Sequence, residues 1–212
     1  MPTGSLETDP RFWVLSEALA SYAADADDPP ARGADYVQAA VSLVIRSSAG
    51  LDLLLIKRAR SDRDPWSGHM ALPGGRRDPS DRTLVDTAVR ETREETGLDL
   101  ASAGAHLGQL DEVATTSPRL PRLAITPFVF GVGRAATAEV ASPEVDAVHW
   151  VPLDDLRTPG TLAAVDIPLP GETRAFPCFH VAGEAVWGLT FRILQQFLDV
   201  YPDAELDELR GG

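Results

Sequence analysis

One stretch of 27 residues constrains this chain more than any other: LPGGRRDPSDRTLVDTAVRETREETGL, residues 72–98. It joins a Pro-Gly-Gly turn to a predicted helix that carries Glu91, Glu94 and Glu95. At about 100° per residue, the three carboxylates fall within roughly a 100° arc beside the apolar side of the helix. Carboxylates held so close repel one another unless a cation lies between them. Mg²⁺ or Mn²⁺ suits such a cluster, because both prefer oxygen ligands and bridge phosphates.

Each part of this stretch has a simpler interpretation when it is taken alone. An acidic helix is most often a solvated face, and a Gly-Gly pair is most often a turn. The ordered combination favours a functional site: five residues separate Gly75 from Asp81, eight more precede Arg90, and the run Arg-Glu-x-x-Glu-Glu-x-Gly follows. Such a combination at fixed spacing is improbable by chance.

These residues resemble the signature of the Nudix hydrolases, G-x5-E-x7-R-E-U-x-E-E-x-G-U, where U is a bulky aliphatic residue. Gly75 corresponds to the first glycine, and the second half of the signature matches at Arg90, Glu91, Glu94, Glu95, Gly97 and Leu98. Two positions depart from the signature. Asp81 replaces the first glutamate, with one more residue before Arg90, and Thr92 replaces the aliphatic residue.

The longer spacing and the pattern PGG-[KR]-x-D-P-x-D resemble the coenzyme A pyrophosphatase branch of that family. The segment LLIKRARSDRDPWSGHMALPGG also resembles the branch motif LL-x-x-R-[SA]-x3-R-x3-G-x3-F-P-G-G. The matching residues are Leu54, Leu55, Arg58, Ala59, Arg63, Gly68 and Pro73 to Gly75. One extra residue lies between Arg63 and Gly68, and Leu72 replaces the phenylalanine. The late segment VWGLTFRIL resembles the closing helix of the branch.

The resemblance implies an α/β fold, an α/β/α sandwich around a mixed β-sheet, and hydrolysis of a nucleoside diphosphate linked to another group. It implies Mg²⁺ or Mn²⁺ held by the Gly75 carbonyl, Glu91, Glu94 and Glu95. The metal would neutralise the diphosphate and lower the pKa of bound water. Glu94 or Glu91 would then act as the catalytic group that takes the proton from the attacking water.

The arginines have separate implied roles. Arg90 is expected to orient the glutamates through charged hydrogen bonds rather than to bind substrate. Arg58 and Arg63 are candidate substrate-binding residues for the phosphates, with ordinary surface arginines as the alternative. The leading function is a pyrophosphohydrolase for coenzyme A or its thioesters. The alternatives are a Nudix hydrolase for ADP-ribose, NADH, a dinucleotide or an oxidised nucleotide, and a nucleotide sensor with no catalytic activity.

Other polar residues give weaker signals. Glu112 and Glu144 lie in or beside later predicted loops, where some relatives keep an additional acidic ligand or base, although a solvated carboxylate is the commoner case. The four histidines, His69, His106, His149 and His180, show no ligand spacing. Cys178 is the only cysteine, which excludes an intramolecular disulfide and predicts a small core residue.

Composition limits the partners. The formal net charge of −13 argues against general binding to nucleic acid or to anionic membranes, which require a basic surface. The apolar run AAVSLVI is too short to span a bilayer, and MPTGSLETDP lacks the features of a secretory signal. We therefore expect a cytoplasmic protein with a small-molecule substrate. The sequence leaves a homodimer open.

Periodicity predicts the elements around the motif. Helices are expected over 9–25 and 188–203, strand hairpins over 36–59 and 173–189, single strands over 105–115, 122–133 and 145–153, a helical turn over 153–156, and a long surface loop over 60–75. One Nudix domain is predicted over 36–200. An N-terminal helix and linker, 1–35, would precede it, and an acidic tail, 201–212, would follow it.

Overall fold

The main sheet of the computed structural model is mixed. The structure describes residues 9–25, 35–62, 64, 66–117, 120–169 and 171–201. At the centre of the sheet, β1 (Val37–Ser47) lies antiparallel to β2 (Leu51–Arg58) and parallel to β7 (Leu123–Val132). The order β3-β2-β1-β7-β5 runs from β3 (Met70–Ala71) to β5 (Gly104–Gln109). Additional pairs join β4 (Gly74–Arg76) to β1, β6 (Val113–Ala114) to β7 and β8 (Val145–Pro152) to β2.

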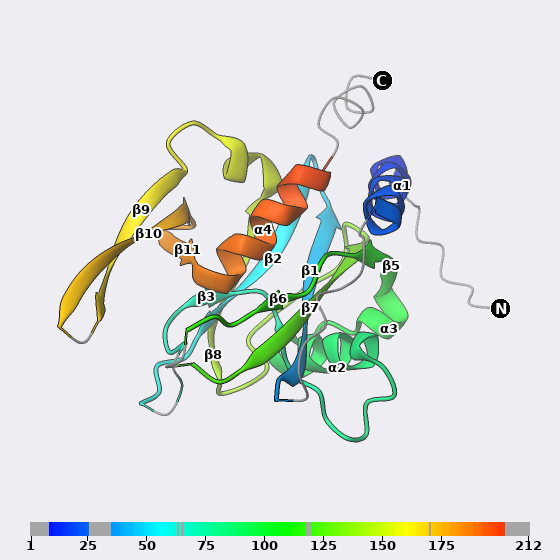
Figure 1. Ribbon diagram of the computed structural model, residues 1–212. Helices are drawn as coiled ribbons and strands as arrows, with labels where there is room; N and C mark the ends of the chain where they lie inside the picture. Colours follow the sequence, from blue (N-terminus) through cyan, green and yellow to red (C-terminus); the bar gives the residue numbers. More distant parts are fainter. Residues whose placement is uncertain are drawn as a thin grey trace.

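Helices cover both faces of this sheet, because side chains alternate along its strands. On β2, Leu53 and Leu55 join one core while Leu54 joins the other. The first core includes residues of α1 (Pro10–Asp25) and α4 (Gly188–Val200), and the second includes residues of α2 (Leu84–Thr96) and α3 (Leu100–Ala103) (Figure 1). The predicted α/β/α sandwich around a mixed sheet is confirmed.

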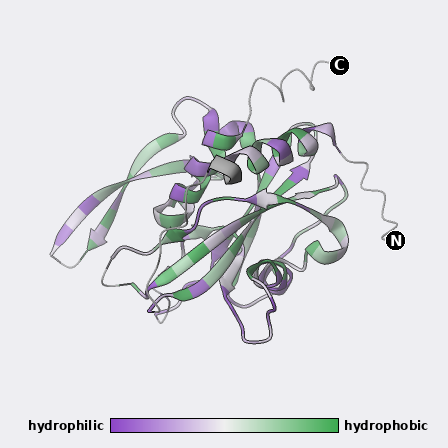
Figure 2. Cartoon of the chain, turned by 45° about the vertical axis from the view of Figure 1, so that its right-hand side comes forward, coloured by the Kyte–Doolittle hydropathy of each residue, from purple (hydrophilic) through white to green (hydrophobic). Residues whose placement is uncertain are grey.

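A second sheet of three strands extends from this body. Its order is β11-β10-β9, with β9 (Leu162–Leu169), β10 (Glu172–Val181) and β11 (Glu184–Trp187) all antiparallel. The hairpin of β9 and β10 projects from the body (Figure 1), and Figure 2 shows hydrophilic residues interspersed along it. The small sheet packs against the body at the inner end of β10 and through β11, where Phe179, Val181 and Val186 join the first core.

Most predicted elements are confirmed, including both long terminal helices, both hairpins and the helical turn η1 (Leu153–Arg157). Buried Cys178 is confirmed as a core residue. The predicted linker residues 26–34 and the tail from 202 onward lie outside the described residues. The helices of the described part include none that is long and apolar enough to cross a membrane.

Three expectations about elements were wrong. The predicted surface loop over 60–75 ends in β3 and β4, with Met70 and Leu72 buried in the core. The predicted strand over 105–115 is two strands, β5 and β6, separated by residues 110–112. Strand β9 was not predicted, since most of its side chains are exposed and Pro168 is typical of an edge.

Candidate catalytic and metal-binding site

Helix α2 begins and ends at well-defined caps. Thr83 and Asp86 form a capping box, in which the backbone N–H of each residue donates to the side chain of the other at 3.1 Å. Gly97 ends the helix in the left-handed conformation at φ 68°, and its N–H donates to the Arg93 carbonyl. These caps fix where α2 begins and ends.

Glu95 is the most buried acidic group of the motif, with 5% of the residue exposed. Its Oε2 accepts a hydrogen bond of 2.9 Å from the Gly74 N–H. Burial raises the pKa of Glu95 to about 7, and the negative charges of Glu91 and Glu144 act in the same direction. The Gly74 N–H and the positive charge of Arg58 offset only part of this increase. Glu95 is therefore a buried carboxyl short of positive partners.

The Glu91 carboxylate lies directly against the backbone of Gly75. A Cβ atom at Gly75 would stand 2.4 Å from Glu91 Oε1 and 2.5 Å from its Cδ, which is far inside contact distance. Only glycine at this position leaves room for the carboxylate. Burial raises the pKa of Glu91, while the charge and hydrogen bond of Arg90 lower it. The two acidic groups Glu91 and Glu95 thus meet at the turn of Gly74 and Gly75.

Arg90 connects the motif to the turn that precedes it. Its Nε and Nη2 donate to the two carboxylate oxygens of Asp81 at 3.0 and 2.9 Å, and its Nη1 donates to Glu91 at 2.9 Å. Asp81 Oδ2 also accepts from the Thr87 hydroxyl and from the Asp78 N–H. The hydrogen bonds from Arg90 are the main reason that the pKa of Asp81 is well below its usual range. This arrangement matches the orienting role expected of Arg90.

Glu94 is more exposed than the other two glutamates of the helix, and it shares the Arg90 Nη1 donor with Glu91. Its side chain is 57% exposed, and its Oε2 stands 3.1 Å from Arg90 Nη1. Within the described ranges, no three His, Cys, Asp or Glu side chains are grouped closely enough to hold an ion. The structure places Glu91 and Glu95 at the glycine turn and Glu94 on the exposed side of Arg90, so a metal shared by all three glutamates stays a prediction.

Residues outside the helix complete the surroundings. Arg58 has an electrostatic interaction with Glu95, and its Nε and Nη2 both lie 2.8 Å from Asp64 Oδ2. Arg63 lies outside the described residues. Glu112 lies in the turn between β5 and β6 and is half-buried.

Glu144 is brought to the site by contacts that sequence patterns do not reveal. The segment before it is fixed to the end of α2, because the N–H groups of Glu139 and Ala141 donate to the carbonyls of Thr96 and Glu95. Glu144 then acts electrostatically on both Glu91 and Glu95. The only sequence signal for Glu144 was its place just before a predicted strand.

The donor set fits a hard divalent cation. Its side-chain donors are carboxylate oxygens, which Mg²⁺ and Mn²⁺ prefer. A cation beside Glu95 would also compensate a buried negative charge that accepts a hydrogen bond from the Gly74 N–H and has two like charges near it. The glycine turn leaves space at Glu91 that a side chain would fill.

In this protein, a glycine turn packs against a helix that carries buried carboxyl groups, and both lie on a mixed sheet between two helical layers. This fold and site define the protein as a Nudix-type pyrophosphohydrolase. Comparison with known proteins agrees. The family model described as the NUDIX domain matches residues 37–169. The chain belongs to the NUDIX domain family, whose enzymes act on diphosphate-linked compounds and generally use divalent metal ions.

Two relatives show how far the likeness extends. The chain is 30% identical over 183 residues to the uncharacterized Nudix hydrolase NudL of Yersinia enterocolitica, a match that covers 86% of this chain and 91% of that protein. It is 42% identical over 118 residues to the uncharacterized protein C14C4.10c of Schizosaccharomyces pombe. That match covers 54% of this chain but spans only 36% of the yeast protein.

Solved structures support the fold. The NUDIX hydrolase from Alicyclobacillus acidocaldarius is similar with a TM-score of 0.51 and 20% identity. The likeness covers 82% of this chain and 96% of that one. At this level of identity, the comparison concerns the fold alone.

Proposed function

We propose that this protein cleaves the diphosphate linkage of coenzyme A or its derivatives and releases 3′,5′-ADP and 4′-phosphopantetheine. The observation that carries this proposal is the position of Arg58. It belongs to the upstream segment that resembles the coenzyme A pyrophosphatase branch, and its positive charge acts on Glu95. A guanidinium at that place is suited to hold a substrate phosphate beside the carboxyl groups. Arg63 is proposed as a second phosphate ligand.

The proposed metal ligands are the Gly75 carbonyl, Glu91, Glu94 and Glu95, with Mg²⁺ or Mn²⁺ as the ion. When bound, the metal supplies charge neutralisation of the diphosphate and a water of lowered pKa. Burial of Glu95 and its hydrogen bond from Gly74 hold that carboxyl in a fixed orientation. Arg90 keeps Glu91 against Gly75 through a hydrogen bond of 2.9 Å.

Glu94 and Glu91 are the proposed groups for moving the proton of the attacking water. Glu94 is exposed and one helical turn from Arg90, so it reaches solvent while remaining beside the other glutamates. Glu91 is half-buried and already placed at the glycine turn. Because deprotonating the attacking water is easier at higher pH and the glutamates must stay ionised to hold the metal, the reaction is expected to be fastest at alkaline pH.

A hydrolysis screen tests this proposal. Coenzyme A, ADP-ribose, NADH, diadenosine polyphosphates and oxidised dGTP are each incubated with Mg²⁺ and with Mn²⁺, and the products are separated and identified. Coenzyme A is expected to be cut fastest, with dephospho-coenzyme A slower because it lacks the 3′-phosphate. A preference for ADP-ribose or NADH would refute coenzyme A as the substrate but would leave diphosphate hydrolysis as the reaction. Full activity after dialysis against excess EDTA would refute the metal requirement.

A further inference from the structure

Three aromatic rings meet where the small sheet contacts the loop after β2. The Trp187 ring of β11 stands 4.6 Å from the His69 ring and 5.3 Å from the Phe176 ring of β10, measured between centroids. The rings are tilted by 53° and 42°, and all three residues are half-buried. We name His69, Phe176 and Trp187 the aromatic cluster. Its rings thus keep part of their surface available to a ligand.

Two cations flank the aromatic cluster. Burial of the His69 ring lowers its pKa, the charges of Arg58 and Lys57 act in the same direction, and the charge of Asp64 opposes them. The Lys57 ammonium pairs with Glu184 at 2.5 Å, and Arg58 pairs with Asp64 at 2.8 Å. Each cation therefore has a side-chain carboxylate as its partner, and a phosphate group could displace such a partner.

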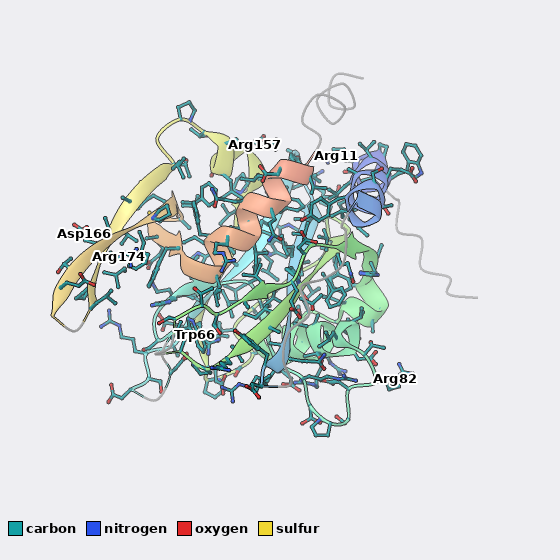
Figure 3. The ribbon with its side chains drawn as sticks, viewed as in Figure 1. Arg11, Trp66, Arg82, Arg157, Asp166 and Arg174 are labelled. Carbon is teal, nitrogen blue, oxygen red and sulfur yellow. The ribbon has the colours of Figure 1, made fainter. Side chains whose placement is uncertain are left out.

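The aromatic cluster is joined to the candidate catalytic site through Arg58. The Arg58 N–H donates to the His69 carbonyl at 2.9 Å, while its charge acts on Glu95. At the other end of the cluster, the Arg174 guanidinium lies 5.3 Å from the Phe176 ring centroid, on the projecting hairpin (Figure 3). If the diphosphate of a substrate lies at Arg58, the aromatic cluster would thus lie on one side of that diphosphate. Arg174 would lie on the far side of the cluster.

We propose that the aromatic cluster, with Lys57 and Arg58, binds the nucleotide half of the substrate: the planar base and the ribose phosphate. This inference rests on the proposed function. Rings beside cations fit a nucleotide, because a base stacks on aromatic side chains and phosphates bind to cations. The pantetheine half is a flexible chain without rings, so it gains less from such a surface. No role in binding was assigned to His69, Phe176 or Trp187 by the sequence.

The test measures binding of each half without hydrolysis. Trp187→Leu removes the central ring and keeps an apolar side chain, and Trp13→Leu is the matched control, since Trp13 is 69% exposed on α1. Calorimetric titrations use 3′,5′-ADP and 4′-phosphopantetheine in turn. We expect Trp187→Leu to weaken 3′,5′-ADP roughly tenfold or more. The control should bind as the unchanged protein does, and 4′-phosphopantetheine should bind equally to all three.

Fluorescence provides a second readout, because a base stacked on Trp187 should quench its emission. The quenching by 3′,5′-ADP should persist in the Trp13→Leu control and be lost in the Trp187→Leu variant. If Trp187→Leu does not fold, Phe176→Leu replaces it in the titrations. Unchanged affinity for 3′,5′-ADP, or weakening of 4′-phosphopantetheine alone, would overturn the inference. Ring-dependent binding of 3′,5′-ADP without coenzyme A hydrolysis would support this site and refute the proposed function.

Discussion

Two buried acidic residues, one just before α2 and one in its last turn, differ in how completely they are partnered. Asp81, in the turn before the helix, accepts hydrogen bonds from Arg90, Thr87 and the Asp78 backbone, and its pKa is lowered. Glu95, in the last turn, is also little exposed but lies deeper among protein atoms and has fewer partners, and burial raises its pKa to about 7. A carboxylate with complete partners stabilises the fold, whereas one without them costs stability unless a cation is bound. The helix is therefore structural at one end and suited to a metal at the other.

The largest expected effect comes from removing the charge of Glu95, the incompletely partnered carboxyl group. Glu95→Gln should reduce kcat/KM roughly a thousandfold, or about 4 kcal/mol, because a ligand charge is lost. The metal-free protein should be no less stable, since the amide oxygen can still accept from the Gly74 N–H and a buried charge disappears. Steady-state kinetics and thermal unfolding measure the two effects. Near-normal turnover with an unchanged circular dichroism spectrum would remove Glu95 from the site.

Substitutions at Gly75 and Gly74 should also separate a loss of activity from a loss of folding. Gly75→Ala places a Cβ 2.4 Å from Glu91 Oε1, the end of a flexible side chain that can move. We expect kcat/KM to fall roughly a hundredfold, as displaced catalytic groups do, with little change in the unfolding temperature. In Gly74→Ala, the Cβ would lie 2.3 Å from the Ala40 carbonyl oxygen, which is backbone, so the folded yield should fall instead. Equal behaviour of the two variants would contradict this.

At Asp81, the fully partnered carboxylate, a substitution is expected to lower the stability of the protein. Asp81→Asn should destabilise the protein by about 3 kcal/mol, because the Arg90 guanidinium loses its buried counterion and an amide N–H faces existing donors. Denaturant unfolding of metal-free protein measures the change. Asp86→Asn is the matched control at the start of α2, since the exposed Arg82 pair that it weakens contributes little and the amide oxygen can still accept from the Thr83 N–H. A cost no larger than that of the control would refute the structural role of Asp81.

The stabilising effect of Asp81 should also depend on pH. Its pKa is lower in the folded protein than the ordinary value of 3.8, mainly through hydrogen bonds from Arg90. The unfolded chain therefore binds the proton first, and the stabilisation is complete above the unfolded pKa and is lost as pH falls through the folded pKa. The stability difference between the unchanged protein and Asp81→Asn should be constant at neutral pH and shrink below about pH 4. A difference that grows on acidification would contradict this.

Local patterns predicted the features of the motif that lie within one helix. The spacing placed Glu91 and Glu95 on one side of α2, and the resemblance gave the mixed sheet around it. Spacing could not determine that Glu94 points outward, because its position lies at the solvent edge of the arc. The approach of Glu144 depends on hydrogen bonds from a distant segment to the end of α2, such as Ala141 N–H to the Glu95 carbonyl. Non-local contacts of this kind leave no periodic signal.

Thr92, where the family signature has an aliphatic residue, is explained by the strand beneath it. Its hydroxyl donates at 2.8 Å to the Ser42 hydroxyl of β1 and also lies 2.8 Å from the Ala88 carbonyl oxygen. Ser42 also donates to that carbonyl, at 3.1 Å. Two buried hydroxyls therefore satisfy one another between the two ends of α2, and a larger side chain at this position would contact Ser42.

The smallest predicted effect tests this pair of hydroxyls. Thr92→Val and Ser42→Ala should each cost about 1 kcal/mol of unfolding free energy, because each leaves one buried hydroxyl with fewer partners. The double variant should cost less than the two single effects together, since both polar groups are then gone. Denaturant unfolding of all four proteins gives the coupling, and kcat/KM should stay within about twofold because neither hydroxyl reaches the carboxyl groups. Additive costs would show that the hydroxyls act independently, and a large loss of activity would extend the catalytic part of α2 to its buried side.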